Sequence, residues 1–177
     1  MENIIDFSHY LLKKHLTKSD VVIDMTVGNG HDTLFLVQIS KFVYGFDIQK
    51  DACVKADGLL KGYQNFKIIN DSHIFFDKYI KDEIAGVIFN LGYLPGGDKN
   101  IHTDATTVLK TLKKILHILK INGICIIVFY PGHKSGFEEA SIIQKYLQSL
   151  NQKEFAVLKY EFINQINNPP FLIAIKK

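Results

Sequence analysis

The chain has 177 residues, 47% of them hydrophobic, and its 21 Lys and Arg against 18 Asp and Glu give a formal net charge of +3. This composition excludes a disordered chain, and two cysteines are too few for a disulfide scaffold. The longest strongly apolar run, 123–130, is far shorter than the roughly 20 residues of a membrane-spanning helix, and residues 1–10 lack the apolar segment of a secretory signal. We therefore expect one cytoplasmic domain over 1–177, with an N-terminal helix within 1–18 and a core over 20–177.

Short apolar runs alternate with segments of helical periodicity along the chain. The runs are bounded by turn residues, as buried strands are, and cover residues 20–25, 41–46, 65–69, 84–91, 123–130, 155–162 and 171–176. Helices are expected over residues 3–16, 31–40, 49–60, 106–120 and 136–150. This alternation predicts an α/β fold with a mostly parallel, doubly wound sheet. The short loop between the last two runs predicts an antiparallel hairpin at the sheet edge.

Polar residues follow the first two strands, at the edge where an open α/β sheet binds its ligands. Gly28 and Gly30 permit a tight turn and a close approach of the backbone to a ligand, although Thr33 replaces the last glycine of G-x-G-x-x-G. Asp47 ends the second strand, where an acid accepts hydrogen bonds from the ribose of an adenosine-type ligand. Two structural alternatives stay open, namely an ordinary strand–helix turn and a helix N-cap at Asp47.

The third and fourth strands end in further candidates. Asp71 is placed to accept a hydrogen bond from an adenine amine or, equally, to cap a short helix. His73 lies beside it, and a single histidine is more often structural than catalytic. Asn90 and Tyr93 have a spacing similar to the N-P-P-Y signature of amino methyltransferases, in which the amide oxygen accepts hydrogens of the substrate nitrogen. A hydrogen-bonded Asn and a packed Tyr are the alternative.

Other chemistries have less support in the sequence. There is no G-x-S-x-G motif, and the histidines and cysteines lack the spacing of metal ligands, so we expect no metal site. Lys110, Lys113, Lys114 and Lys120, expected on one helix, form either a phosphate-binding patch or, as we favour, a solvated face.

Several sequence blocks resemble a small bacterial family. They comprise residues 23–33, 45–49, 72–73, 89–99, 106–107, 132–133, 164–165 and 168–171. The block 89–99 (FNLGYLPGGDK) is much more specific than a glycine loop, whereas Met25 stands where the family more usually has Ala. On these blocks the chain is identified as a member of the MnmM-type tRNA 5-(aminomethyl)-2-thiouridine methyltransferase family, formerly described as rRNA methylases.

The resemblance implies a class I, Rossmann-like methyltransferase fold with S-adenosyl-L-methionine (SAM) as cofactor. It implies methylation of the primary amine of 5-aminomethyl-2-thiouridine at the tRNA wobble position, an anticodon loop as partner, and a homodimer. Asn90 and Tyr93 would be the catalytic residues at the transfer centre. The residues expected at the cofactor are Asp24, Gly28, Asn29, Gly30, His31, Asp32, Asp47, Gln49, Asp71, Ser72 and His73.

Methyl transfer from a sulfonium needs chiefly the in-line placement of a neutral amine. An alkylamine is mostly protonated at neutral pH, so a base or a desolvated site must remove its proton, and His31 and His133 are candidate helpers. Three alternatives stay open: a methyltransferase acting on rRNA or a small molecule, a nucleotide-binding oxidoreductase, and a SAM-binding module without activity. Thr33 speaks against the oxidoreductase.

Overall fold

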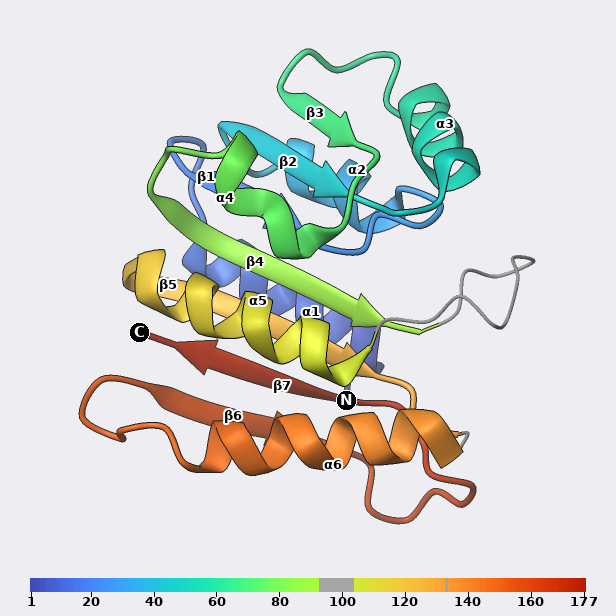
Figure 1. Ribbon diagram of the computed structural model, residues 1–177, viewed down its shortest axis with the longest axis vertical. Coiled ribbons are helices and arrows are strands. Elements are labelled where there is room, and N and C mark those ends of the chain that lie inside the picture. Colours follow the sequence, from blue (N-terminus) through green and yellow to red (C-terminus); the bar gives the residue numbers. More distant parts are fainter. Residues whose placement is uncertain (93–103, 133) are drawn as a thin grey trace.

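The strands of the computed structural model, which describes residues 1–92, 104–132 and 134–177, form one sheet in the order β3-β2-β1-β4-β5-β7-β6 (Figure 1). They are β1 (Val21–Asp24), β2 (Phe42–Phe46), β3 (Phe66–Ile69), β4 (Ile84–Leu91), β5 (Leu119–Phe129), β6 (Ala156–Tyr160) and β7 (Phe171–Lys176). The first five strands pair in parallel, whereas β7 is antiparallel to both β5 and β6. The predicted parallel sheet with an antiparallel C-terminal hairpin is confirmed, and β7 lies inside the sheet while β6 forms the edge.

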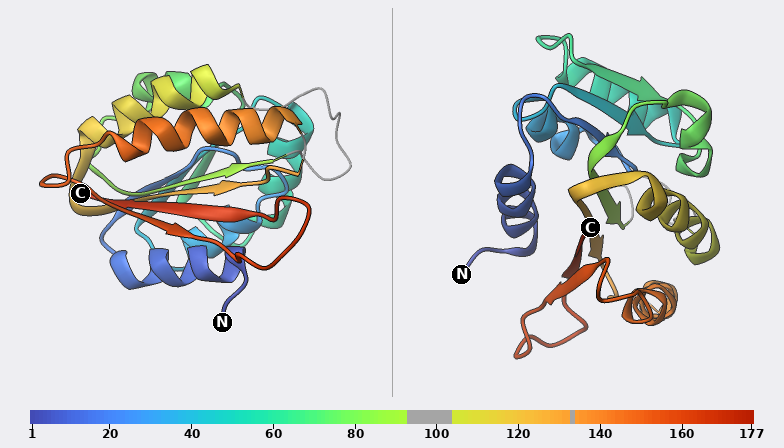
Figure 2. Two further views of the ribbon diagram at one scale, coloured as in Figure 1. Left: turned by 90° about the horizontal axis from the view of Figure 1, so that it is seen from below. Right: turned by 90° about the vertical axis from the view of Figure 1, so that its left-hand side faces the viewer.

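Helices cover both faces of this sheet. They are α1 (Ile4–His15), α2 (His31–Val37), α3 (Lys50–Leu59), the 3-10 turn η1 (His73–Phe75), α4 (Phe76–Tyr79), α5 (Ala105–Ile118) and α6 (Lys134–Gln148). Figure 2 shows α1 and α2 on one face and α4, α5 and α6 on the other. This doubly wound arrangement confirms the predicted α/β class.

The end of α5 differs from its prediction. The helix ends at Ile118, and β5 begins at once because Leu119 pairs with Ile84 of β4. Lys120 therefore lies on a strand, where its ammonium group pairs with the buried carboxylate of Asp20. The prediction that Lys120 shares a helix face with the lysines of α5 was wrong, because strand pairing replaces the helical periodicity after residue 118.

The central strands are buried on both faces, which makes the sheet a firm platform for its carboxyl edge. On one face Val87 and Phe89 of β4 belong to the same core cluster as Leu112 of α5. On the other face Ile88 belongs to a second cluster with Leu12 of α1. Each of these side chains is at most 1% exposed.

None of the helices within the described ranges combines the length and apolar character needed to cross a membrane.

Candidate functional site

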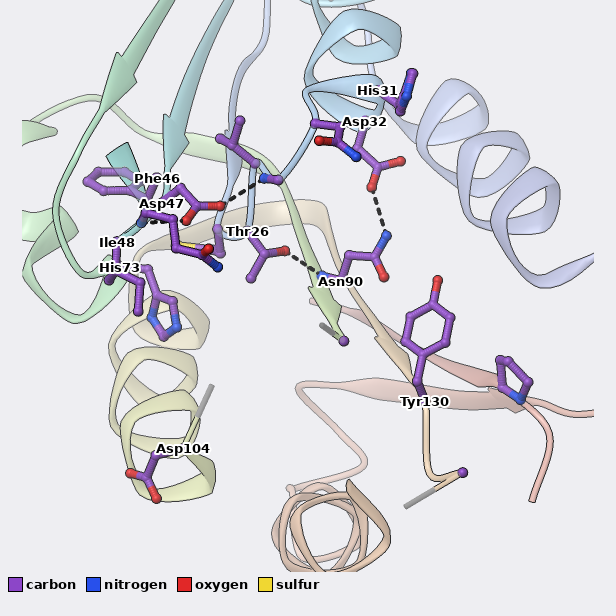
Figure 3. A pocket seen from close by; sticks show the side chains of 18 of the residues that line it. Thr26, His31, Asp32, Phe46, Asp47, Ile48, His73, Asn90, Asp104 and Tyr130 are labelled. Atoms are coloured by element: carbon purple, nitrogen blue, oxygen red, sulfur yellow. Dashed lines mark hydrogen bonds between the residues drawn. The ribbon is translucent and has the colours of Figure 1, made fainter. Parts of the chain in front are cut away.

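A cavity of about 890 Å³ lies at the carboxyl edge of the sheet, next to the ends of β1 and β4 (Figure 3). The chain order of the strands reverses between β1 and β4, which is where open α/β sheets bind their ligands. The volume is within the range of roughly 300–1,000 Å³ that is typical of small-molecule sites. The cavity walls come from the β1–α2 loop, the ends of β2, β3 and β4, the start of α5 and the segment 165–170.

Asp47 holds the glycine loop in place. Its Oδ2 accepts the N–H of Gly28 and its Oδ1 accepts the N–H of Gln49, each at 2.8 Å (Figure 3). Gly28 and Gly30 have φ angles of +53° and +85°, a region that side chains other than glycine's rarely adopt. Asp47 does not cap α3, whose N-cap is Gln49, so the remaining lone pairs of this carboxylate can accept ligand hydroxyl groups.

The turn after β3 forms a second wall. Ser72, not Asp71, caps the short helix that follows, and Asp71 accepts the hydroxyl of Tyr79 at 2.7 Å. The ring of His73 is 6% exposed, and its Nδ1 lies 2.9 Å from the hydroxyl of Thr111. Burial lowers the pKa of His73 to about 4, so its ring is neutral at neutral pH. Ile48, 57% exposed, adds an apolar surface to the same region of the cavity.

Asn90 lies where the end of β4 meets the β1–α2 loop. Its backbone N–H donates to the hydroxyl of Thr26 at 2.7 Å, and its side-chain nitrogen donates to Oδ2 of Asp32 at 3.1 Å (Figure 3). Because a carboxylate only accepts hydrogen bonds, the amide nitrogen must face Asp32, and the amide oxygen turns toward Tyr130. The site thus presents a hydrogen-bond acceptor on the side of Asn90 away from Asp32.

Tyr130 follows β5 and lines the cavity beside Asn90. Burial, and then the negative charge of Asp32, raise the pKa of the Tyr130 hydroxyl, while the side chain of Asn90 opposes this effect. The phenol therefore keeps its proton at neutral pH.

Asp32 is held from its other side by a residue of the N-terminal helix. The Nε2 of His9 on α1 lies 2.7 Å from Oδ1 of Asp32. The His9 ring also stacks on Phe35 of α2, with a centroid distance of 4.0 Å and an interplanar angle of 3°. No motif of the sequence pointed to His9.

The cavity brings together most of the residues predicted to bind the cofactor. Those that line it are Gly28, Asn29, His31, Asp32, Asp47, Gln49, Asp71, Ser72 and His73, together with Asn90. Tyr93 and the candidate helper His133 lie outside the described residues.

Asp24 and Gly30, which we expected at the cofactor, are not among the residues that line the cavity. Asp24 is fully buried below the loop, where it accepts the hydroxyl of Thr33 at 2.6 Å and the N–H of Thr26 at 3.1 Å. Burial, followed by the charge of Asp32, raises the pKa of Asp24. Gly30 is the N-cap of α2. Both residues shape the β1–α2 loop.

Other cavity residues received no role from the strand-end pattern. They include Asp104, Thr107, Tyr130 and the segment 165–170. One feature of the sequence indicates a role for the segment 165–170. The polar, proline-containing stretch between the last two strands is much longer than a tight hairpin turn requires.

The charge of the cavity distinguishes between ligand classes. Four carboxylates, those of Asp32, Asp47, Asp71 and Asp104, and no lysine line the described part of the cavity. Such a wall attracts a cationic group, such as a sulfonium or an ammonium, and repels the diphosphate of a dinucleotide.

Comparisons with known proteins agree with this geometry. The model of a family described as "Putative rRNA methylase" matches residues 43–176. The chain is 32% identical to the chloroplastic tRNA (mnm(5)s(2)U34)-methyltransferase of Arabidopsis thaliana over 188 aligned positions, which cover 97% of this chain and 69% of that protein.

Solved structures give the same picture. The putative rRNA methylase of Clostridium thermocellum matches with a TM-score of 0.97 and 38% identity, over 100% of this chain and 98% of the other. The putative methyltransferase of Streptococcus mutans, solved in complex with SAH, matches with a TM-score of 0.94 and 39% identity, over 100% of this chain and 99% of the other. The predicted methyltransferase fold is confirmed.

Proposed function

We propose that the protein is a SAM-dependent methyltransferase acting on the primary amine of 5-aminomethyl-2-thiouridine at the tRNA wobble position. The chain belongs to the family described as "Putative rRNA methylase". The observation that carries this proposal is the acidic cavity in which the amide of Asn90 lies between Asp32 and Tyr130. The Arabidopsis relative, named for the modified uridine at position 34 of tRNA, supports the choice of substrate.

The residues present fit SAM by their charge and their order around the cavity. We assign the ribose hydroxyls to Asp47 and the adenine to Asp71, Ser72 and His73, and we assign the methionine part to the loop at Gly28. The neutral ring of His73 suits an uncharged aromatic base. When bound, SAM supplies a methyl group that its positively charged sulfur has already activated.

The protein's own part is to present a neutral, correctly oriented amine. The amide oxygen of Asn90 is the acceptor that we assign to an amine hydrogen, and the protonated hydroxyl of Tyr130 lies next to it. Asp32 is only 8% exposed, so the part of the site next to it is shielded from bulk water. Loss of water lowers the pKa of an alkylamine, whereas the nearby carboxylates raise it, so the neutral form also requires a group that takes the proton.

The alternatives from the sequence differ in their support. The acidic lining speaks against a dinucleotide-dependent oxidoreductase, because no lysine of the described cavity balances a diphosphate. An rRNA or small-molecule substrate and a SAM-binding module without activity are the remaining alternatives. The homodimer, the cytoplasmic location and a single domain over residues 1–177 stay predictions.

The test is methyl transfer from SAM labelled in its methyl group. We expect label in tRNA from a strain that lacks the wobble methylation, and none in rRNA from the same strain. Transfer RNA that already carries the methyl group is the matched control and should stay unlabelled. Label in rRNA with none in tRNA would contradict the proposed substrate.

A further inference from the structure

We propose that His9 is a positioning residue of the transfer site, which fixes Asp32 and, through Asp32, the amide orientation of Asn90. The inference rests on the proposed function, because it assigns the substrate amine to the oxygen of Asn90. It adds a residue of α1 that does not itself line the cavity.

The contact between His9 and Asp32 is partly buried and is fixed by the packing of the His9 ring. The side chains of His9 and Asp32 are 23% and 10% exposed, so water competes little for the hydrogen bond. The imidazole lies nearly parallel to the ring of Phe35, which fixes the plane in which Nε2 meets the carboxylate. Leu11 and Leu12 anchor α1 in the core close to His9. His9 is therefore a packed donor at a fixed place.

Asp32 needs this donor because of its neighbours. Among the described residues, Nε2 of His9 contacts Oδ1 of Asp32 and the amide nitrogen of Asn90 donates to its Oδ2. The fully buried carboxyl group of Asp24 interacts with Asp32 as a like charge. Without His9, an almost buried carboxylate would lose the hydrogen bond at its Oδ1 beside a second acid. Asp32 would then be free to rotate away from Asn90.

A rotation of Asp32 would change the orientation of the Asn90 amide. An amide presents either an acceptor oxygen or a donor nitrogen, and the contact with Asp32 selects which of the two faces the cavity. If the amide turns over, its nitrogen meets the amine donor to donor. The loss would appear in turnover, whereas cofactor binding at Asp47 would be unaffected because His9 is absent from that part of the cavity.

The matched variants separate the hydrogen bond from the packing. His9→Phe keeps a ring on Phe35 and removes the N–H donor, whereas His9→Gln supplies an amide N–H in place of the imidazole. His15→Phe is the control, because His15 lies on the same helix and its Nδ1 lies 2.9 Å from the backbone oxygen of Leu11. His9→Leu is a second variant without the donor, should His9→Phe unfold.

The first readout is steady-state methyl transfer to tRNA. We expect kcat of His9→Phe to fall about 10- to 100-fold, as is typical when the outer partner of an active-site group is removed. KM and the Kd for SAH should change by less than about twofold, because the hydrogen bond acts on orientation and not on binding. His9→Gln should recover most of kcat, and His15→Phe should match the wild type.

The second readout does not depend on turnover. The side-chain amide signal of Asn90 in the NMR spectrum of the SAH complex, identified by its loss in Asn90→Ala, should move in His9→Phe and return in His9→Gln. An unchanged kcat or an unchanged amide signal in His9→Phe would overturn the inference. If the wild type itself fails to methylate tRNA, the proposed function fails, and the amide signal still decides whether His9 positions Asn90.

Discussion

At the scale of single residues, the aspartates of the carboxyl edge differ in what they contact, although the sequence shows the same side chain. Asp47 binds backbone N–H groups of a loop, and Asp32 binds two side chains. Asp24 lies only eight residues before Asp32, yet it is fully buried and supports the loop from below. Their contacts, not their residue type, decide which of them can meet a ligand.

Two substitutions should separate cofactor binding from turnover. Asp47→Ala removes an acceptor from the glycine loop and from the proposed ribose site, so we expect the Kd for SAH to rise at least about tenfold. Asn90→Ala should leave that Kd nearly unchanged and lower kcat roughly 100-fold, the scale of losing one oriented hydrogen bond in a transition state. Calorimetry with SAH and a transfer assay measure the two effects.

Exposed residues that are not among those lining the cavity give the controls. Asp51→Ala changes an acid in the first turn of α3, and Asn151→Ala changes an amide before β6. Neither should alter SAH binding or turnover. Normal turnover in Asn90→Ala would show that its assigned role is wrong.

The sequence was sufficient to find Asp47 and Asn90, because each ends a strand and strand ends converge in a parallel sheet. It was not sufficient for His9, because only the packing of α1 against α2 brings His9 to Asp32, 23 residues later. Tyr130 was read as the last residue of a strand, and its place beside Asn90 depends on the pairing of β4 with β5. Contacts of this kind leave no periodic signal in one sequence.

At the scale of elements, the glycine loop depends on its contact with β2. The N–H of Val27 donates to the carbonyl of Phe46 at 3.0 Å, which ties the loop to the strand end. A Cβ atom on Gly45 would come within 2.6 Å of Val27 and 2.8 Å of Ile68. Glycine at this position lets the loop approach the strand closely.

Gly45→Ala should therefore destabilise the protein by about 1–3 kcal/mol, the usual cost of overpacking a core, and should weaken SAH binding through the displaced loop. Gly58→Ala is the matched control, because a Cβ there meets nothing within 4 Å in helix α3. We expect it to be neutral or stabilising by up to about 1 kcal/mol. Urea unfolding measures both, and equal stabilities would refute the close contact.

The succession of strands and helices was predictable because apolar runs and helical periodicity are local signals. The runs 84–91 and 171–176 coincide with β4 and β7. The boundary between α5 and β5 was not predictable, since Leu116 and Leu119 continue the helical pattern and only the pairing of Leu119 with Ile84 ends it. The position of β7 between β5 and β6 is likewise a property of the sheet and not of any segment.

At the scale of the whole molecule, charge is distributed unevenly. All 21 basic residues are lysines, and none of them lines the described cavity. Lys114 of α5 pairs with Asp77, and Lys159 of β6 pairs with Glu161. The cavity is therefore suited to cationic groups, and any phosphate contacts must come from the surface around it.

Stability should depend on pH through His73. Because burial lowers its pKa to about 4, the unfolded chain binds a proton between about pH 6.5 and 4 that the folded chain does not. His73 therefore destabilises the fold as the pH falls through this window, by up to roughly 3 kcal/mol. Asp24, with its raised pKa, acts in the opposite direction, so only a comparison with a variant isolates His73.

The comparison is between the wild type and His73→Gln, which cannot titrate in this range. The stability of the wild type relative to the variant should decrease between about pH 7 and 4, as measured by urea unfolding at each pH. A difference that stays constant with pH would mean that His73 is not buried in its neutral form.

The most direct measurement is nucleoside mass spectrometry of tRNA that lacks the wobble methylation, after incubation with the purified protein and SAM. We expect 5-aminomethyl-2-thiouridine to disappear and 5-methylaminomethyl-2-thiouridine to appear in equal amount, and both changes to be roughly 100-fold slower with Asn90→Ala. A methyl group on any other nucleoside, or no product from a protein that binds SAH normally, would contradict the proposed function.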